Sequence, residues 1–340
     1  MGRKGYATYG SSWTPPDYEV DERGKLVGGY TPPGRDNWGR WGEEDERGAA
    51  NLTTPAMIAA AAKLVESGEV FSLALPIGDP TPAFPGRPTG KHYFLMSGTD
   101  AVSGSPYNEH APGFVYNDDA IDIVLQGSTQ WDGLAHAVAE DSVYNGFWAG
   151  NVTAMRGAAK VAIGAMREKF IGRGVLLDLA RVASVDSLEP GHVVTPEELD
   201  AACEAQNVSV GEGDILLLRT GYLSRWWGLE TADEKTAYFM DGEPGPGFAC
   251  VDWFADRDIA AVSCDTVGLE VLPGEPNQPR VLPVHHSLLV DLGITIGELW
   301  ELDKLAEACV ADGRYEFLLI APPLYLPRAV GSVLNPIAIK

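Results

Sequence analysis

The sequence predicts an α/β protein with helices packed on a largely buried sheet. Short apolar segments rich in β-branched residues alternate with amphipathic helical segments along the chain. Of the 340 residues, 45% are hydrophobic and 21% are charged, so the chain can bury a sizeable core. We find no break in composition, internal repeat or low-complexity tract. We therefore expect one domain over residues 51–340, preceded by an extended arm or lid over residues 1–50, which are rich in Gly, Pro, Trp and charge.

The first elements follow from capping residues and from proline content. A helix is predicted from Thr54 and Pro55 to about Ser67, because threonine is a good N-cap and proline is tolerated at the first helical position. Residues 70–77 follow as a strand. Residues 78–117 carry many prolines and glycines, which indicates a long connection of the kind that shapes a pocket.

The rest of the chain alternates between predicted strands and helices. We expect strands over residues 120–130, 174–180, 214–220, 259–266 and 315–326, and helices over residues 158–170, from Thr195-Pro196 onward, around 248–258 and over 297–310. Apolar strands separated by helices are typical of a sheet that is covered on its faces.

Charge and composition exclude several classes of partner. The 25 basic residues face 48 acidic ones, a net charge of -23, which argues against nucleic acid and anionic membranes. No apolar run approaches the ~18 residues of a membrane span, and the amino terminus lacks the apolar core of a signal peptide. The four cysteines are far apart and form no CxxC pair. These features are typical of a cytoplasmic protein that acts on a small molecule.

One short stretch, QGSTQWDGLAH, concentrates polar side chains. If a strand runs through it, Gln126, Gln130 and Asp132 share one face, because successive side chains of a strand point to opposite faces. Gly133 then permits a sharp turn that brings His136 toward the same spot. The alternative interpretation is a solvated strand edge, where polar alternation is ordinary.

A second polar cluster lies in VLPVHHSLLVDLGITIGEL, residues 281–299. His285 and His286 end a loop, and Glu298 begins the predicted helix, where the helix dipole favours a carboxylate.

Together these segments resemble the cyclase family that includes bacterial kynurenine formamidase and isatin hydrolase. QGSTQWDGLAH is similar to the family signature HxGTHxDxPxH, with Thr129, Asp132 and His136 at matching positions, and His286 and Glu298 stand as the family's downstream histidine and glutamate do. Further similar segments are residues 37–55, 173–181, 213–222 and 263–273. The resemblance implies a swivelling β/β/α fold with a mixed sheet and flanking helices, a homodimer or homotetramer, and hydrolysis of an amide, lactam or lactone.

The chain departs from the signature at its first two histidines, which are Gln126 and Gln130 here. In the family both bind metal, together with the aspartate and the downstream pair, and the last signature histidine is the acid/base. A carboxamide offers one uncharged oxygen and is a poor ligand for zinc. We therefore expect either no metal or a weakly bound divalent ion, Mn²⁺ or Mg²⁺ rather than Zn²⁺. Its ligands would be Asp132, Gln126, Gln130, His286 and Glu298.

The leading hypothesis is a hydrolase that needs no metal, with His136 as general acid/base. The expected catalytic set is His136, Asp132, His286 and Glu298, and the expected substrate-binding set is Gln126, Gln130, Thr129 and Trp131. Glutamine amides could donate to a developing oxyanion. Three alternatives remain open: a hydrolase with one oxygen-bound ion, a non-hydrolytic cyclase or dehydratase, and a binding or scaffold protein without turnover.

Overall fold

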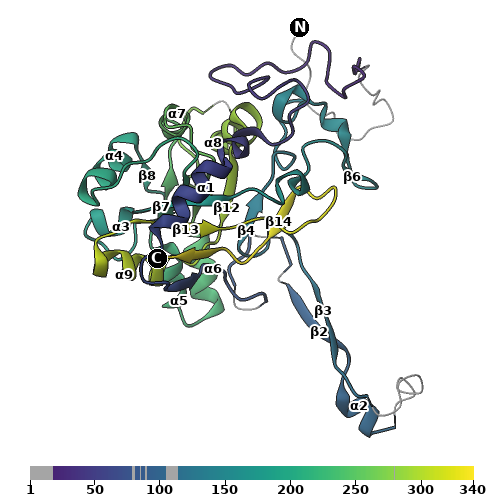
Figure 1. Ribbon diagram of the computed structural model, residues 1–340, viewed down its shortest axis with the longest axis vertical. Helices are drawn as coiled ribbons and strands as arrows, with labels where there is room; N and C mark the ends of the chain where they lie inside the picture. Colours follow the sequence, from purple (N-terminus) through teal and green to yellow (C-terminus); the bar gives the residue numbers. More distant parts are fainter. Residues whose placement is uncertain (1–17, 79–80, 85, 89, 105–113, 279) are drawn as a thin grey trace.

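A nine-stranded mixed sheet organises the molecule (Figure 1). The computed structural model describes residues 18–78, 81–84, 86–88, 90–104, 114–278 and 280–340. In sheet order the strands are β1 (Val70–Ser72), β15 (Ile337–Ile339), β13 (Glu316–Ile320), β7 (Ile171–Asp178), β9 (Ile215–Arg219), β11 (Ala261–Cys264), β12 (Thr295–Glu298), β4 (Gln130–Asp132) and β14 (Gly331–Val333). Strands β7, β9, β11 and β12 run parallel, and the other pairings are antiparallel. This mixed sheet with flanking helices confirms the predicted fold class.

Helices and short ladders surround the sheet. The helices are α1 (Pro55–Ala61), α2 (Gly98–Val102), α3 (Leu179–Val182), α4 (Pro196–Ala205), α5 (Tyr222–Trp227), α6 (Ala232–Asp241), α7 (Cys250–Asp256), α8 (Pro283–His285) and α9 (Asp303–Asp312). Short 3-10 turns are η1 (Gly48–Leu52), η2 (Ala62–Leu64), η4 (Tyr144–Gly146), η5 (Ala149–Asn151) and η6 (Ile163–Met166), and η7 (His286–Leu292) is a π-helical segment. Two-stranded ladders among the described residues pair β8 (Val193–Val194) with β10 (Gly245–Pro246), β5 (Val152–Thr153) with β6 (Gly157–Ala158), and β2 (Lys91–Met96) with β3 (Asp118–Asp122).

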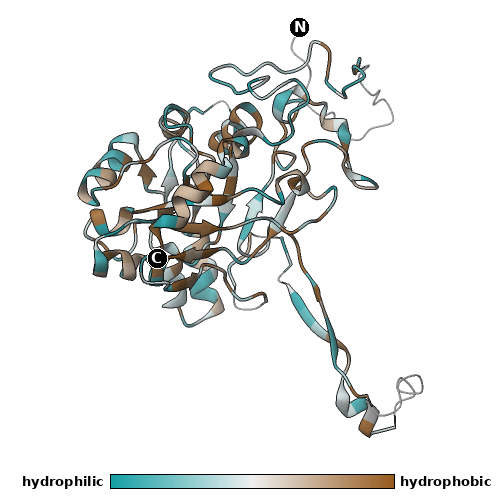
Figure 2. Ribbon diagram, viewed as in Figure 1, coloured by the Kyte–Doolittle hydropathy of each residue, from teal (hydrophilic) through white to brown (hydrophobic). Residues whose placement is uncertain are grey.

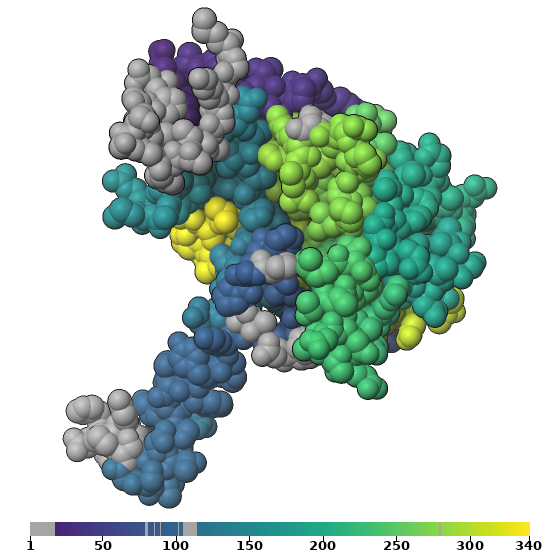
Figure 3. All heavy atoms as spheres, turned by 180° about the vertical axis from the view of Figure 1, so that it is seen from behind, coloured from purple at the N-terminus to yellow at the C-terminus, as the bar shows by residue number. Residues whose placement is uncertain are grey.

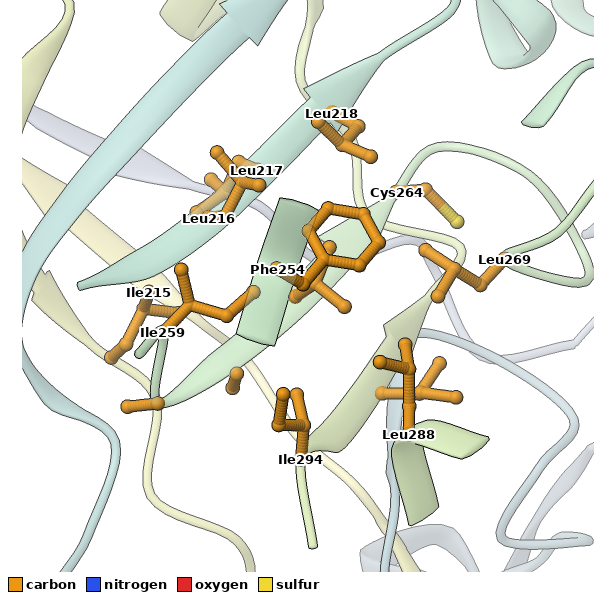
Figure 4. Packing of buried hydrophobic residues seen from close by; sticks show 14 of the residues in the cluster. Ile215, Leu216, Leu217, Leu218, Phe254, Ile259, Cys264, Leu269, Leu288 and Ile294 are labelled. Carbon is orange, nitrogen blue, oxygen red and sulfur yellow. The ribbon is translucent and has the colours of Figure 1, made fainter. Parts of the chain in front are cut away.

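The core lies on the parallel strands, which are the most apolar part of the ribbon (Figure 2). Phe254 of α7 is fully buried among residues of β9, β11 and η7, including Leu216, Cys264 and Leu288 (Figure 4). Helix α1 packs on β7 and β13, and α4 packs on β7. Side chains from one cluster therefore fill the space between the sheet and its helices.

Several sequence-predicted elements are confirmed with shorter bounds. The helix expected at Thr54 ends at Ala61, and Thr54 accepts a hydrogen bond from the backbone of Met57, as an N-cap does. Helix α4 begins after Thr195 with a complete capping box. The strand expected over residues 70–77 is paired over Val70–Ser72 alone, and the strand expected over 315–326 ends at Ile320.

Four predictions of secondary structure are wrong. Residues 120–130 do not form one strand, because β3 ends at Asp122 and β4 begins at Gln130. Residues 158–170 contain β6 and the turn η6 in place of a helix; Val161 and Phe170 have positive φ and are fully buried, so core packing overrides helical periodicity. Residues 297–310 are split between β12 and α9, which places Glu298 on a strand. Residues 78–117 hold β2 and α2 and so are more than a connection.

Residues 18–50, the described part of the predicted arm, lie against η7. The side chain of Asn37 donates to the carbonyl of Leu292 at 2.8 Å, and the Trp38 indole donates to the carbonyl of Val290 at 2.7 Å. The Tyr30 hydroxyl donates to Asp291 at 2.8 Å. In the part of the chain that the structure describes, no helix is long and apolar enough to cross a membrane.

Candidate active site

Two neighbouring strands bring three polar side chains of the candidate site onto one face of the sheet. Strand β4 pairs antiparallel with β12, and Gln130 stands opposite Glu298 in this register. Asp132 is two residues further along β4 and therefore points to the same side. All three side chains are buried. The sequence therefore predicted this convergence correctly, although Glu298 reaches it from a strand.

A histidine completes the cluster, and it is His285. Ligand atoms of Asp132, His285 and Glu298 all lie within 4.8 Å of one another. The Nε2 atom of His285 is 3.1 Å from Oε1 of Glu298. The family resemblance implied His286 at this position. His286 is instead the first residue of η7, and its Nδ1 is a buried atom without a hydrogen-bond partner among the described residues. The structure therefore corrects the expected position by one residue.

Glu270 holds His285 in place. One Glu270 oxygen lies 2.7 Å from the Nδ1 atom of His285 and also accepts the backbone N–H of the same residue at 2.7 Å. The other oxygen accepts the backbone N–H of Val284 at 3.2 Å. Because Nδ1 contacts this carboxylate, the other ring nitrogen, Nε2, faces Glu298. Sequence reasoning missed Glu270, although it recognised residues 263–273 as a family-like segment.

The side chains of Gln126 and Gln130 make different contacts. Gln130 donates from Nε2 to Oε2 of Glu298 at 2.6 Å, while its Oε1 is buried without a partner among the described residues. Gln126 is not on β4, and its buried Nε2 also lacks a partner there. A Cβ added to Gly331 of β14 would lie 2.3 Å from that Nε2 atom, so the glycine makes room for the Gln126 side chain.

His136 lies at the accessible side of the cluster. Its backbone N–H donates to the carbonyl of Gly133 at 2.8 Å, which is the sharp turn expected from the sequence. The Nε2 atom is 3.6 Å from Oδ2 of Asp132, and the side chain of His136 is 26% exposed while that of Asp132 is 1% exposed. A substrate can therefore reach the imidazole more readily than the carboxylate behind it.

Burial and charge set the protonation of the cluster. Burial raises the pKa of Asp132 to about 6, with Glu298 adding to the rise and His136 opposing it. Burial by itself lowers the pKa of His285, but its hydrogen bonds to Glu270 and Glu298 outweigh burial and raise that pKa to about 10. Three carboxylates thus share a poorly hydrated space with two imidazoles. Such a site favours an added cation or protons, because unpaired buried charge is costly.

Two expected substrate-binding residues are engaged elsewhere. The Thr129 hydroxyl donates to the carbonyl of Leu299 at 2.5 Å and accepts the N–H of Leu75 at 2.8 Å. The Trp131 indole is fully buried in the core and donates to the carbonyl of Ala321 at 2.7 Å. Trp131 points away from the site because it alternates with Gln130 and Asp132. Both residues therefore have structural partners in place of the ligand contacts that we expected.

The donor set fits one divalent metal ion. Asp132 and Glu298 offer carboxylate oxygens and His285 offers an imidazole nitrogen, which are ordinary ligand types for such ions. The Oδ1 atom of Asp132 is buried without a partner among the described residues, so it has an acceptor position left for a cation or a donor. A surface hollow of about 690 Å³ lies elsewhere, lined by Asp186, Glu189 and Arg225 among others, and shares no residue with the cluster.

The fold and this buried cluster define an α/β protein with a carboxylate–imidazole site beside the edge of a mixed sheet. The sequence model of the family described as "Putative cyclase" matches residues 71–271, more than half of the chain. A crystal structure described as a novel cyclase is 42% identical, with a TM-score of 0.85, and the match covers 90% of this chain and 100% of that one. The chain therefore belongs to the cyclase family.

More distant structures share the fold. Isatin hydrolase A from Labrenzia aggregata bound to benzyl benzoate is 20% identical, with a TM-score of 0.58 and coverage of 82% of this chain and 94% of that one. Isatin hydrolase A from Ralstonia solanacearum is 19% identical, with a TM-score of 0.57 and coverage of 85% and 99%. No curated protein matches the chain.

Proposed function

We propose that the protein is a hydrolase that opens a small cyclic or aryl amide, lactam or lactone, with His136 as acid/base and one divalent ion held by Asp132, His285 and Glu298. The observation that carries the proposal is the convergence of these three buried ligands within 4.8 Å, beside a histidine that is partly exposed. Likeness in fold to isatin hydrolases, whose name indicates a cyclic amide substrate, supports the substrate class.

The chain's own groups account for the proton transfers. His136 takes the proton of the water that attacks the carbonyl carbon, and it then gives this proton to the leaving nitrogen or oxygen. A carbon–oxygen bond forms, the scissile bond breaks, and no further reactant is consumed. Asp132, 3.6 Å from the imidazole, stabilises the protonated ring between the two transfers.

The glutamines keep roles of their own. Gln130 donates to one oxygen of Glu298, and its own Oε1 is a buried acceptor without a partner among the described residues. The Nε2 atom of Gln126 is a buried donor without a partner among the described residues and is available to a substrate carbonyl. When a divalent ion is bound, it supplies positive charge that polarises a carbonyl oxygen. Because most donors are oxygen, Mn²⁺ or Mg²⁺ suits the site better than Zn²⁺.

A metal-free hydrolase is the second candidate, and one observation favours it. Gln130, Glu298, His285 and Glu270 form a continuous chain of hydrogen bonds in which protonated His285 balances two carboxylates. In that state the ring of His285 would be a fixed positive charge, and catalysis would depend on His136 and the amides alone.

Metal content and turnover separate the candidates. Protein purified without added metal should be measured by elemental analysis, and Mn²⁺ binding should be followed by titration calorimetry for the wild type, Glu298→Gln and the exposed control Glu189→Gln. We expect one ion per chain, lost in Glu298→Gln and retained in the control. Turnover of lactams, aryl amides and lactones should fall after chelation and return with Mn²⁺. Full turnover without any ion would support the metal-free candidate, and absence of turnover in the loaded protein would contradict a hydrolase.

A further inference from the structure

Arg87 is a half-buried arginine beside the candidate site. Its Nη1 atom donates to the backbone carbonyl of Gln126 at 2.9 Å, and its side chain makes no other hydrogen bond among the described residues. A guanidinium has N–H donors on each of its nitrogens. Most of the donors of Arg87 are therefore available to a bound molecule.

Arg87 also has no ion-pair partner among the described residues. The half-buried arginines Arg173 and Arg219 differ in this respect, because each of them contacts two carboxylates. Moving a guanidinium out of water without a counter-charge is costly. Arg87 is therefore suited to an anion that comes from outside the described chain.

The guanidinium of Arg87 is held in place by aromatic rings. The backbone N–H of Arg87 donates to the carbonyl of Phe84 at 3.0 Å in a tight turn, and the guanidinium lies 5.4 Å from the centre of the Phe84 ring. That ring packs edge to face on Phe239 of α6, with the ring centres 5.9 Å apart. Figure 3 shows this part of the chain, in blue, beside the green surface of α6. A side chain that is already ordered loses less conformational entropy when it binds a ligand.

The segment that carries Arg87 adjoins the buried cluster. A Cβ added to Gly127 would lie 3.8 Å from the carbonyl oxygen of Pro88, so this segment lies against the start of the signature stretch. Burial raises the pKa of Asp132, and the positive charge of Arg87 acts against that rise. Arg87 therefore places a permanent positive charge near a cluster that is rich in carboxylates.

We infer that Arg87 anchors a carboxylate of the substrate, which rests on the proposed function and narrows its substrate class to amides, lactams or lactones that also carry an acid group. A carboxylate accepts two parallel N–H groups of a guanidinium, and Nε and Nη2 remain for this because the carbonyl of Gln126 occupies Nη1. The anchor also offsets the repulsion between an acidic substrate and a chain with a net charge of -23. Arg87 determines specificity and takes no part in the proton transfers.

Binding of matched ligands tests the anchor without requiring turnover. Acetanilide and the three isomers of acetamidobenzoate share an aromatic ring and an amide, and they differ by one carboxylate. Their Kd values should be measured by ligand-observed NMR titration for the wild type, Arg87→Gln, Arg87→Lys and Arg328→Gln. Glutamine at position 87 removes the charge and keeps a donor for the carbonyl of Gln126. Arg328 is the matched control because it is exposed and donates from Nη1 to a backbone carbonyl, that of Arg156, at 3.2 Å.

We expect at least one isomer of acetamidobenzoate to bind the wild type at least tenfold more tightly than acetanilide does. Arg87→Gln should remove this preference while the Kd for acetanilide changes by less than about twofold. Arg87→Lys should keep part of the preference, and Arg328→Gln all of it. A wild type that prefers none of the acids would overturn the inference. Equal weakening of acid and acetanilide by Arg87→Gln would also overturn it, since Arg87 would then only support the segment of Gln126.

Turnover of the same compounds in the presence of Mn²⁺ separates this inference from the proposed function. Hydrolysis consumes one water and releases acetate together with aniline or the aminobenzoate. An acid that binds through Arg87 and is not hydrolysed supports the anchor and counts against the hydrolase. Equal kcat/KM for the acids and acetanilide supports the hydrolase and contradicts the anchor. A tenfold fall in kcat for acetanilide in Arg87→Gln would place the guanidinium at the reacting carbonyl, and the anchor would be wrong.

Discussion

His136 differs from the other members of the cluster because it is accessible and is not one of the three converging ligands. Replacement by glutamine should remove the acid/base without removing the ion. We expect kcat to fall by about 10²–10⁴-fold, the usual contribution of general acid–base catalysis, while the metal content stays at the wild-type value. Steady-state kinetics and elemental analysis of one preparation check both. A fall smaller than tenfold would assign the proton transfers to another group.

Glu270 should control metal affinity although it is not itself a converging ligand. Its carboxylate fixes the ring of His285 through a 2.7 Å contact, and outer carboxylates of this kind typically change metal affinity by about 10–100-fold. We therefore expect Glu270→Gln to raise the Kd for Mn²⁺ by that factor in titration calorimetry. Glu189→Gln serves as the control. If the Kd is unchanged, the role of Glu270 is confined to folding, which thermal unfolding of the same variant would reveal.

Single residues show how far sequence reasoning reaches. The family resemblance implied that Asp132, Gln130 and Glu298 meet in one site, and the structure brings them together, although Glu298 was expected on a helix and lies on β12. The choice between His285 and His286 could not be made from spacing. Each step along a helix turns the side chain by about 100°, and the junction of α8 with the π-helical η7 lies between these two residues.

Among the elements, β14 shapes the site because its residue Gly331 has no side chain and so leaves room for Gln126. A Cβ at Gly331 would lie 2.3 Å from Nε2 of Gln126 and 2.9 Å from the carbonyl oxygen of Trp131. Gly331→Ala should therefore displace the Gln126 amide and raise KM or lower kcat at least tenfold. Gly172→Ala, in β7, is the matched control, since a Cβ there meets nothing within 4 Å. Equal kinetics in the two variants would argue against a role for Gln126 in substrate binding.

Elements with local capping signals were predicted more accurately than elements defined by apolar pattern alone. The Glu198 carboxylate accepts the backbone N–H of Thr195 at 2.8 Å, and the Thr195 hydroxyl accepts the backbone N–H of Glu198 at 3.3 Å. The helix start expected at Thr195-Pro196 is thereby confirmed. Residues 158–170 have helical spacing of apolar side chains, yet they form turns whose side chains fill the core beside β4. Periodicity reports which residues are buried, and it does not distinguish a helix from a buried irregular segment.

For the whole molecule, the alternation of apolar and helical segments predicted one buried sheet with flanking helices, and the family resemblance implied that the sheet is mixed, but neither predicted the shape of its projections. The proline and glycine content of residues 78–117 indicated a connection that shapes a pocket. The structure shows the β2–β3 hairpin in this range, with exposed apolar side chains. The expectation of an oligomer came from the family resemblance alone and stays a prediction.

The stability of the whole molecule should depend on pH through Glu243. This side chain is fully buried, accepts the N–H of Gly268 at 2.8 Å, and keeps its second oxygen without a partner among the described residues. Burial, together with the nearby charge of Glu298, raises the pKa of Glu243 from 4.5 to about 8. Between these values the folded protein keeps the proton that the unfolded chain releases. A rise in pH therefore favours the unfolded chain, by up to about 1.4 kcal/mol per pH unit for this group.

Glu243→Gln removes this ionisation and keeps an acceptor for Gly268. We expect the variant and the wild type to have similar free energies of unfolding below pH 5, and the variant to be increasingly more stable as the pH rises to 8, with no further gain above it. Urea unfolding of both proteins at pH 5, 6, 7 and 8 measures the difference, and Glu189→Gln, at an exposed acid, should follow the wild type at each pH. If the difference in free energy of unfolding between the two proteins does not change with pH, Glu243 is ionised in the folded protein. In that case a positively charged group or further donors must lie beside it.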